Sequence, residues 1–366
     1  LIFDEIISTF LINSKIRKTI KKIKKIKKKF DDSEIIKIKK KFGFELTDDQ
    51  KISIDEINQD LKSDQKMFRL LQGDVGSGKT IVALIASANV ISSGFQVCFM
   101  APTEILAKQH YTLANKLFDN DINIKLLTSK TEYKERKQII KDLNINKINI
   151  LIGTHSLFQD KIKYNNLGLI IIDEQHKFGV KQRKKLSDKG GKNCDVLVMS
   201  ATPIPRTMIM TIFGDMDTSI IKNKPKHRKE IKTYSKLESK TDEVIKFVKK
   251  QIIQKNQVFW VCPLIDESKK VDHQSAVKRY ESLKKIFKNK VGLLHGALNN
   301  EEKNNILINF LNKKIDILVS TTVIEVGIDF PSANIIIIEN ANKFGLSQLH
   351  QLRGRVGRGD KESYCI

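Results

Sequence analysis

The chain has 366 residues, 40% of them apolar, which is enough to bury two hydrophobic cores of ordinary domain size. Its 66 basic residues outnumber its 42 acidic ones, and the net charge of +24 favours a polyanionic partner such as nucleic acid, although lysine is common along the whole chain. The four cysteines are widely separated, which excludes a disulfide framework or a zinc-binding spacing and favours a cytoplasmic protein. No apolar run approaches the roughly 20 residues that span a bilayer, so we expect no membrane partner.

Near the start of the chain, apolar residues recur every three or four positions from Ile12 to Phe30, with lysine at most positions between them. This spacing predicts an amphipathic helix with a strongly basic outer face. Such a face would lie on nucleic acid or on a membrane, or would be the solvated side of a helix packed on its neighbour. The chain begins with leucine and ends, at Glu362 to Ile366, like an interrupted strand, so we expect a piece of a longer protein.

From Phe44 onward, short apolar runs alternate with amphipathic segments, which predicts parallel sheets covered by helices on both faces. A charged segment, Lys222 to Lys232, interrupts this pattern. We therefore expect a basic helical connector at 1–43, a first α/β domain at 44–222, a linker at 223–232 and a second α/β domain at 233–366. The predicted strands are Met67–Leu71, Gln96–Met100, Ile148–Ile152, Leu167–Ile172, Val196–Met199, Val258–Val261, Val291–Leu294, Ile317–Ser320 and Ile335–Ile338.

Residues 73–80 read GDVGSGKT and fall between a predicted strand and a predicted helix. Gly73, Gly76 and Gly78 let the backbone turn sharply around Ser77, so that N–H groups and the start of the helix face the phosphates of a nucleotide. Lys79 would contact the β- and γ-phosphates, and the Thr80 hydroxyl would bind Mg²⁺. The pattern predicts an ATP site; the alternative is a glycine-rich turn without a ligand.

The acidic pair Asp173-Glu174 directly follows the predicted strand Leu167–Ile172. Ligands bind at the carboxyl ends of strands in open parallel sheets, so this pair is expected beside the phosphate loop. Asp173 would be the outer-shell partner of Mg²⁺, and Glu174 would be the base that polarises the attacking water. Without a phosphate loop, such a pair would more often be a turn or a helix cap. His176 would couple nucleotide to nucleic acid, or would be an ordinary core histidine.

Three loops after predicted strands have no obvious purpose in a simple phosphate-binding domain. Their backbone N–H and hydroxyl groups would suit the phosphates of a nucleic-acid strand, with the third loop relaying between that strand and the acidic pair. Each loop taken singly could instead be an ordinary capped loop. The residues concerned are Pro102, Thr103, Gly153, Thr154, His155, Ser200 and Thr202.

In the second domain, Arg355 and Arg358 lie three residues apart in a glycine-punctuated turn after Gln351. Guanidinium groups so placed would reach the γ-phosphate and stabilise the charge of the transition state, so that closure of the two domains would switch hydrolysis on. Other strand ends add groups for a nucleic-acid backbone, for the nucleotide or for an interdomain contact: His295, Thr321, Thr322, Gly327 and Asp329. A buried turn histidine is the alternative for His295.

From about Phe44 to Cys365 the chain resembles the motor portion of the RecG family of superfamily 2 helicases. The resemblance implies two tandem RecA-like domains, and it assigns Gln50 to the contact with adenine. The transcription-repair coupling translocases are similar in most motifs, but Ser77 and Gln175 favour RecG; Lys177 replaces the arginine usual there. The matching stretches are GDVGSGKT, MAPTEILAKQH, IGTHSLF, DEQHKFGV, SATPIPRT, STTVIEVGIDFPSAN and QLHQLRGRVGRG.

The resemblance implies a monomeric ATP- and Mg²⁺-dependent translocase that acts on branched double-stranded DNA, including replication forks and Holliday junctions. The wedge domain and the C-terminal hook of that family lie outside this stretch, so we expect ATP binding here and fork selectivity to depend on those parts. The basic segment at 12–30 resembles the connector from the wedge. An RNA helicase and a nucleic-acid scaffold without hydrolysis are the alternatives.

Overall fold

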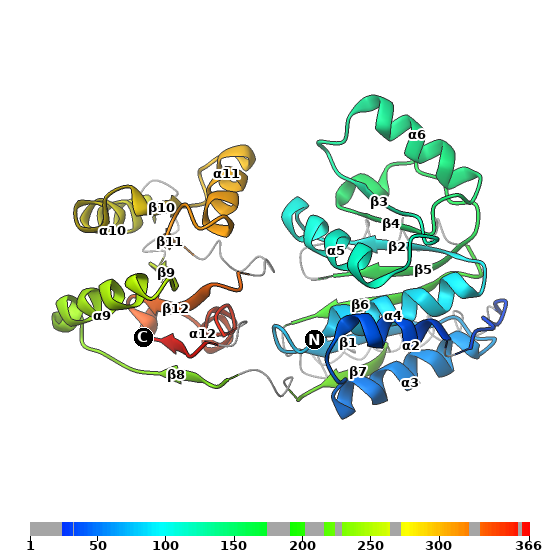
Figure 1. Ribbon diagram of the computed structural model, residues 1–366, viewed down its shortest axis with the longest axis horizontal. Coiled ribbons are helices and arrows are strands. Elements are labelled where there is room, and N and C mark those ends of the chain that lie inside the picture. Colours follow the sequence, from blue (N-terminus) through cyan, green and yellow to red (C-terminus); the bar gives the residue numbers. More distant parts are fainter. Residues whose placement is uncertain are drawn as a thin grey trace, which may run out of the picture. The chain divides into compact units, whose positions relative to one another are not determined.

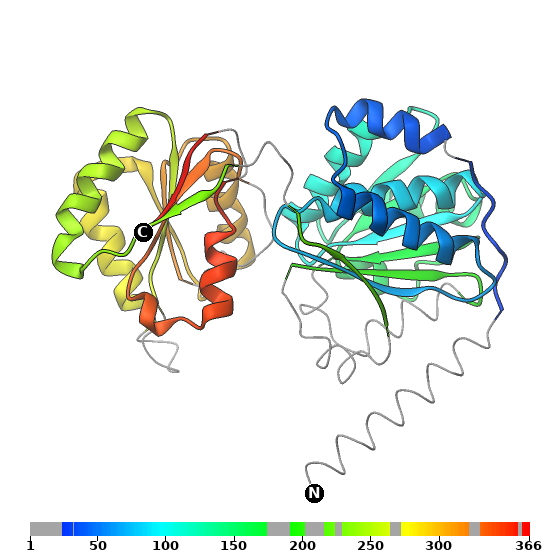
Figure 2. The same cartoon turned by 90° about the horizontal axis from the view of Figure 1, so that it is seen from below.

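The computed structural model describes residues 24–31, 33–173, 191–201, 216–223, 229–263, 272–321, 330–357 and 361–366. The contacts within the chain divide it into two units, Leu1–Pro225 and Lys226–Ile366. Each unit contains a parallel sheet with helices on both faces, as Figures 1 and 2 show. The predicted fold class, two α/β domains in tandem, is confirmed.

The first unit is built on a seven-stranded sheet in which every pairing is parallel, in the order β3-β4-β2-β5-β6-β1-β7. The central strands β2, β5 and β6 are buried at every position, because helices cover both faces of the sheet. The strands are β1 Phe68–Gly73, β2 Gln96–Met100, β3 Ile124–Leu127, β4 Ile150–Gly153, β5 Leu167–Ile172, β6 Asp195–Ser200 and β7 Asp217–Ile221.

Two hydrophobic cores lie on the two faces of this sheet. Side chains alternate along each strand, so that Phe99 joins the core beneath α3, α4 and α5 while its neighbour Cys98 joins the core beneath α6. Helix α4 is buried nearly all round, because α2 and α3 pack against its outer side (Figure 1). The helices are α2 Ser33–Phe42, α3 Asp48–Lys62, α4 Lys79–Ser92, α5 Glu104–Leu117, α6 Tyr133–Asn144 and the 3₁₀ turn η1 His155–Phe158.

The second unit has a six-stranded parallel sheet in the order β10-β11-β9-β12-β13-β8. Figure 2 shows it nearly edge-on, with α9 and α10 on one face and α11 and α12 on the other. The elements are β8 Ile231–Thr233, η3 Glu238–Lys240, α9 Thr241–Ile253, β9 Gln257–Val261, α10 Asp272–Phe287, η4 Lys288–Lys290, β10 Val291–Leu294, α11 Asn300–Leu311, β11 Ile317–Ser320, β12 Ala333–Ile338, η6 Ala341–Lys343, α12 Leu346–Arg353 and β13 Ser363–Cys365. No helix among the described residues is both long and apolar enough to cross a membrane.

Every predicted strand is found, displaced by at most a few residues. The sequence reading missed β3, β7 and β8, which are all edge strands. An edge strand is covered incompletely, so its apolar pattern is weaker: only two of the five residues of β7 are buried, and none of β8 is. Strand β8 begins at Ile231, inside the segment predicted to be a linker.

The predicted basic helix from Ile12 to Phe30 is wrong over the part that the structure describes. Residues 24–30, which we call the strap, contain no helix; Lys24 forms an antiparallel bridge with Gln65, and helix begins only at Ser33. The strap backbone is hydrogen-bonded to the end of α3, with Lys25 N–H donating to Asp64 O at 2.9 Å and Lys28 N–H to Leu61 O at 3.1 Å. Residues 1–23 lie outside the described residues.

A buried carboxylate explains why the strap does not form the predicted helix with solvent-exposed lysines. Asp195, the first residue of β6, accepts hydrogen bonds from Lys25 Nζ at 2.7 Å and Lys28 Nζ at 2.6 Å, and all three side chains are fully buried. The same carboxylate accepts the backbone N–H of Met67, just before β1, at 2.7 Å. Burial lowers the pKa of Lys25, and the nearby Asp195 opposes this shift. One carboxylate therefore joins the strap, β1 and β6.

Replacing Asp195 tests this arrangement. Asp195→Asn leaves two ammonium groups buried without a counter-charge, so we expect the free energy of unfolding of the first unit to fall by about 3–5 kcal/mol in chemical denaturation. Asp64→Asn is the matched control, because Asp64 pairs with Lys24 on the surface. It should cost far less. Equal losses from the two substitutions would contradict this account of the strap.

Candidate functional site

The predicted phosphate loop lies between β1 and α4, as its chemistry requires. Gly76 and Gly78 have φ values of +78° and +86°, which glycine adopts without strain. Lys79 Nζ donates to the backbone carbonyls of Gly73 at 2.6 Å and Asp74 at 3.0 Å, so its ammonium lies inside the loop. The Ser77 hydroxyl is buried and has no hydrogen-bond partner among the described residues. The loop thus presents a cation and an unsatisfied hydroxyl on glycine-rich backbone.

Gln50 contacts this loop directly. It is the third residue of α3, where its side-chain carbonyl accepts the N–H of Thr47 at 2.9 Å in a capping box. Its amide nitrogen donates to Ser77 O at 2.8 Å. A Cβ at Gly78 would approach this nitrogen to 2.2 Å. The conformation of the phosphate loop and the position of the Gln50 side chain therefore depend on each other. The contact of Gln50 with adenine stays a prediction.

Asp173 lies at the same edge of the sheet as the phosphate loop. It follows β5, and the strand order β5-β6-β1 places it two strands away from the loop, with the end of β6 between them. Its backbone N–H donates to Met100 O at 2.9 Å, and its side chain is 10% exposed. Glu174 and His176 lie outside the described residues, so their predicted roles stay predictions.

The predicted nucleic-acid loops also gather at this edge. Pro102 and Thr103 follow β2, Thr154 and His155 follow β4, and Ser200 ends β6; these strands are all parallel. Ala101 N–H donates to Gly153 O at 2.9 Å, which joins two of the loops. The Thr103 hydroxyl caps α5 by accepting the N–H of Leu106 at 3.3 Å. Capping, which the sequence left open as the alternative, is thus one role of Thr103. Thr202 lies outside the described residues.

The sequence reading missed His110, which contacts Asp173. His110 lies on α5, and its Nε2 is 2.9 Å from Asp173 Oδ2. The signal was available: the last four buried residues of α5, which are Ala107, His110, Ala114 and Leu117, are spaced three or four apart, and His110 is the polar member of that apolar face. A buried polar group on such a face needs a partner, and here the partner is the predicted Mg²⁺ ligand.

In the second unit, the predicted residues lie in two places. His295 follows β10 and Thr321 follows β11 at the carboxyl edge of the sheet, where Thr321 N–H donates to Leu294 O at 3.3 Å. Gln351 is on α12. Arg355 lies, buried, in the turn after α12, and Gly357 in the same turn approaches the first residues of β8 and β13. Thr322, Gly327, Asp329 and Arg358 lie outside the described residues.

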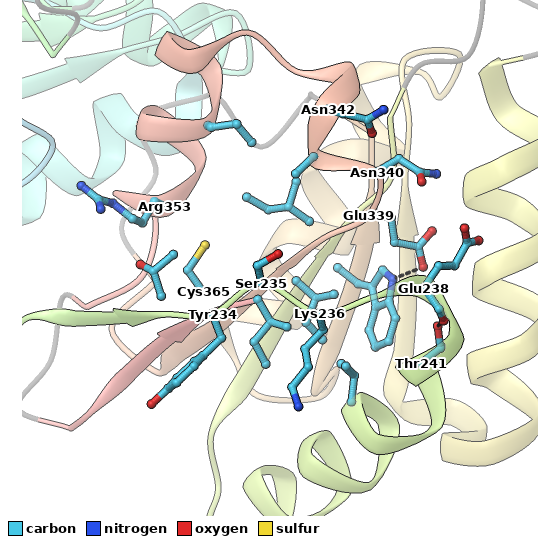
Figure 3. Close-up of a pocket in the computed structure, with 18 of the residues that line it drawn as sticks. Tyr234, Ser235, Lys236, Glu238, Thr241, Glu339, Asn340, Asn342, Arg353 and Cys365 are labelled. Atoms are coloured by element: carbon cyan, nitrogen blue, oxygen red, sulfur yellow. Dashed lines mark hydrogen bonds between the residues drawn. The ribbon is translucent and has the colours of Figure 1, made fainter.

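The second unit also contains a pocket of about 790 Å³ that the sequence reading did not predict (Figure 3). It opens at the carboxyl ends of β9, β12 and β13 and is bordered by η3 and α12. Glu339 organises its wall: it accepts Trp260 Nε1–H at 2.7 Å and pairs with Arg279, whose guanidinium lies over the Trp260 ring. Burial raises the pKa of the neighbouring Cys262, so this thiol stays protonated. None of the predicted site residues lines this pocket.

The first-unit site fits a magnesium nucleotide. No group of three or more His, Cys, Asp or Glu side chains among the described residues could hold a metal ion. Thr80 and Asp173 offer the oxygen ligands that Mg²⁺ prefers, and Mg²⁺ is usually held by one or two such groups together with substrate phosphates. Lys79 and the N-terminus of α4 offer positive charge for those phosphates.

Comparison with known proteins agrees with this geometry. Residues 47–211 match the DEAD/DEAH box helicase model, and residues 239–360 match the helicase conserved C-terminal domain. The chain is 48% identical over 344 residues to the ATP-dependent DNA helicase RecG of Bacillus subtilis and 49% identical over 368 residues to that of Aquifex aeolicus. This chain belongs to the RecG family. The resemblance inferred from the motifs is confirmed.

The aligned regions cover 93% and 100% of this chain and 50% and 46% of those two RecG proteins, so the chain spans about half the length of the curated relatives it matches. A solved structure of RecG bound to a three-way DNA junction superimposes with a TM-score of 0.87 at 45% identity, covering 99% of this chain and 48% of that one. Mss116p bound to single-stranded RNA and AMP-PNP superimposes at 0.66 with 20% identity, over 92% of this chain and 72% of that one, and shows the fold alone.

Two glycine substitutions compare the same backbone strain inside the phosphate loop, next to Gln50, and outside it. In Gly78→Ala the new methyl group displaces the Gln50 amide, whereas Gly94→Ala, with a φ of +81°, meets nothing within 4 Å. Both variants should lose about 1–2 kcal/mol of stability from the left-handed backbone. Only Gly78→Ala should also weaken nucleotide binding, measured by titration with a fluorescent ATP analogue. Equal affinity in the two variants would contradict a role for the Gln50 contact.

Proposed function

We propose that this chain is the ATP-driven motor of a RecG protein, which moves along double-stranded DNA and remodels stalled replication forks and recombination junctions. The observation that supports this most is the gathering of the phosphate loop, Asp173 and three candidate DNA loops at one sheet edge. The relatives, which are named ATP-dependent DNA helicases, and the RecG structure on a three-way junction support the choice of substrate.

In the proposed ATP site, Lys79 neutralises the β- and γ-phosphates. Thr80 and Asp173 hold Mg²⁺, which when bound supplies charge stabilisation to the phosphates. Glu174 orients and polarises the attacking water as a general base, a role that contributes about 10²- to 10⁴-fold in rate. Gln50 contacts the adenine base, and the phosphates are surrounded by Gly73, Gly76, Ser77 and Gly78.

We assign the switch for hydrolysis to the second unit. Arg355 and Arg358 would stabilise the charge on the γ-phosphate in the transition state, and Gly327 and Asp329 would contact the nucleotide. An arginine finger raises the rate by about 10³- to 10⁵-fold. This corresponds to about 4–7 kcal/mol. In this proposal the first unit binds the nucleotide and the second unit supplies the arginines. Hydrolysis would therefore depend on how the two units are arranged.

The proposed partner is the phosphate backbone of branched double-stranded DNA. The net charge of +24 favours association with DNA of any sequence. The proposed contacts and coupling residues are Pro102, Thr103, Gly153, Thr154, His155, His176, Ser200, Thr202, His295, Thr321, Thr322 and Gln351. We propose that the protein acts as a monomer in the cytoplasm, where its DNA substrate lies.

ATP hydrolysis tests the proposal directly. We expect the rate to rise on addition of branched DNA and to fall by at least about 100-fold in Lys79→Ala and in Glu174→Gln, because these remove phosphate neutralisation and water activation. Lys137→Ala, on the exposed side of α6, is the control and should keep the rate. Equal turnover with and without DNA would refute a motor, and stimulation by RNA alone would indicate an RNA helicase.

Salt dependence tests the phosphate interface. The logarithm of the DNA affinity should fall linearly with the logarithm of the salt concentration, with a slope of about −0.9 for each phosphate neutralised on a duplex. Fluorescence anisotropy with a labelled three-way junction measures the slope. An affinity that does not change with salt would show that the basic residues do not bind the DNA backbone.

A further inference from the structure

His110 and Asp173 form a buried pair between α5 and the end of β5. His110 is 4% exposed, and its Nε2 lies 2.9 Å from Asp173 Oδ2. Asp173 is also held through its backbone, because its N–H donates to Met100 O at 2.9 Å. The position of this carboxylate is therefore set at two points, one on the backbone and one on a carboxylate oxygen.

The imidazole ring is itself held in place. It stacks on Phe99 with ring centroids 4.6 Å apart and an interplanar angle of 29°. Phe99 is fully buried in β2, where it pairs with Ile171, two residues before Asp173. Strand β2 thus supports the ring while the adjacent β5 supports the carboxylate. The histidine thus has a stacking partner and a polar partner on neighbouring strands.

We propose that His110 is a positioning residue, which fixes the Asp173 carboxylate for the cation of a bound nucleotide and ties it to helix α5. The inference rests on the proposed function, because it takes Asp173 as a cation ligand. The hydrogen bond engages Oδ2 of this carboxylate. Side chains that orient a metal ligand in this way typically change metal affinity or activity by about 10- to 100-fold when they are replaced.

Helix α5 gives this contact a second consequence. The helix begins after its N-cap Thr103, in the loop that we assign to the DNA backbone, and His110 lies seven residues further along. At a rise of about 1.5 Å per residue, the two positions are about 10 Å apart on one helix. A displacement of the Pro102–Thr103 loop on DNA binding therefore reaches Asp173 through a single rigid element and one hydrogen bond.

Two substitutions separate the hydrogen bond from the ring. His110→Phe keeps a ring that can stack on Phe99 but has no polar atom for Asp173, whereas His110→Gln loses the ring and retains an amide nitrogen at a similar reach. The measurement is the binding of a fluorescent ATP analogue as Mg²⁺ is added from zero, so that it reports cation binding without hydrolysis. We expect the half-saturating Mg²⁺ concentration to rise by about 10- to 100-fold in His110→Phe and by only a few-fold in His110→Gln.

Leu117→Ala is the control, because Leu117 is equally buried on the same helix and belongs to the apolar core. It should lower the melting temperature without changing the Mg²⁺ dependence. An unchanged Mg²⁺ dependence in His110→Phe, or a larger shift in His110→Gln than in His110→Phe, would overturn the proposal. Wild-type protein that bound no nucleotide would refute the proposed function itself, so the two failures are distinguishable.

The link to DNA has its own measurement. At saturating Mg²⁺, we expect the ratio of ATP hydrolysis rates with and without a three-way junction to fall at least several-fold in His110→Phe and to stay at the wild-type value in Leu117→Ala. A wild-type ratio in His110→Phe would show that α5 does not transmit DNA binding to Asp173 through this histidine, and would overturn that part of the proposal.

Discussion

Parallel strand pairing is the constraint on which the candidate site depends. All the pairings in both sheets run in one direction, so the loops that follow the strands of a sheet meet at a single edge. The phosphate loop, the Pro102–Thr103 loop, Asp173 and Ser200 are distant in the chain, and they lie at one edge of the first unit because they follow neighbouring parallel strands. A parallel sheet must be covered on both faces, which is why the strands that bring these residues together are almost entirely apolar.

The described polar groups of the site are held by contacts with one another as much as by the sheet. Gln50 joins the start of α3 to the carbonyl of Ser77, and His110 joins α5 to Asp173. Lys79 turns back onto the carbonyls of Gly73 and Asp74. Each contact connects an element at the edge of the site to a residue with a proposed part in the chemistry. A movement of α3 or α5 would therefore displace Ser77 or Asp173 in the candidate nucleotide site.

Most of the fold could be read from the sequence, because buried strands of a parallel sheet are continuous apolar runs. The edge strands β3, β7 and β8 could not, since partial exposure allows polar residues that weaken the pattern. The strap was misread for a different reason. Its apolar residues recur with helical spacing, but Lys25 and Lys28 face inward because a carboxylate 167 or more residues away needs a counter-charge. Local periodicity contains no information about such a partner. His110 could be recognised as the polar residue on the apolar face of α5, but the pattern could not identify Asp173 as its partner.

The strap also affects how the first unit unfolds at the amino ends of its strands. Two ammonium groups and a backbone N–H donate to one fully buried carboxylate, so the loss of any one contact leaves a buried donor without its carboxylate partner. A force that pulls on the chain before Lys24 would therefore act on the amino ends of β1 and β6. These lie at the opposite ends of the strands from Gly73 and Ser200.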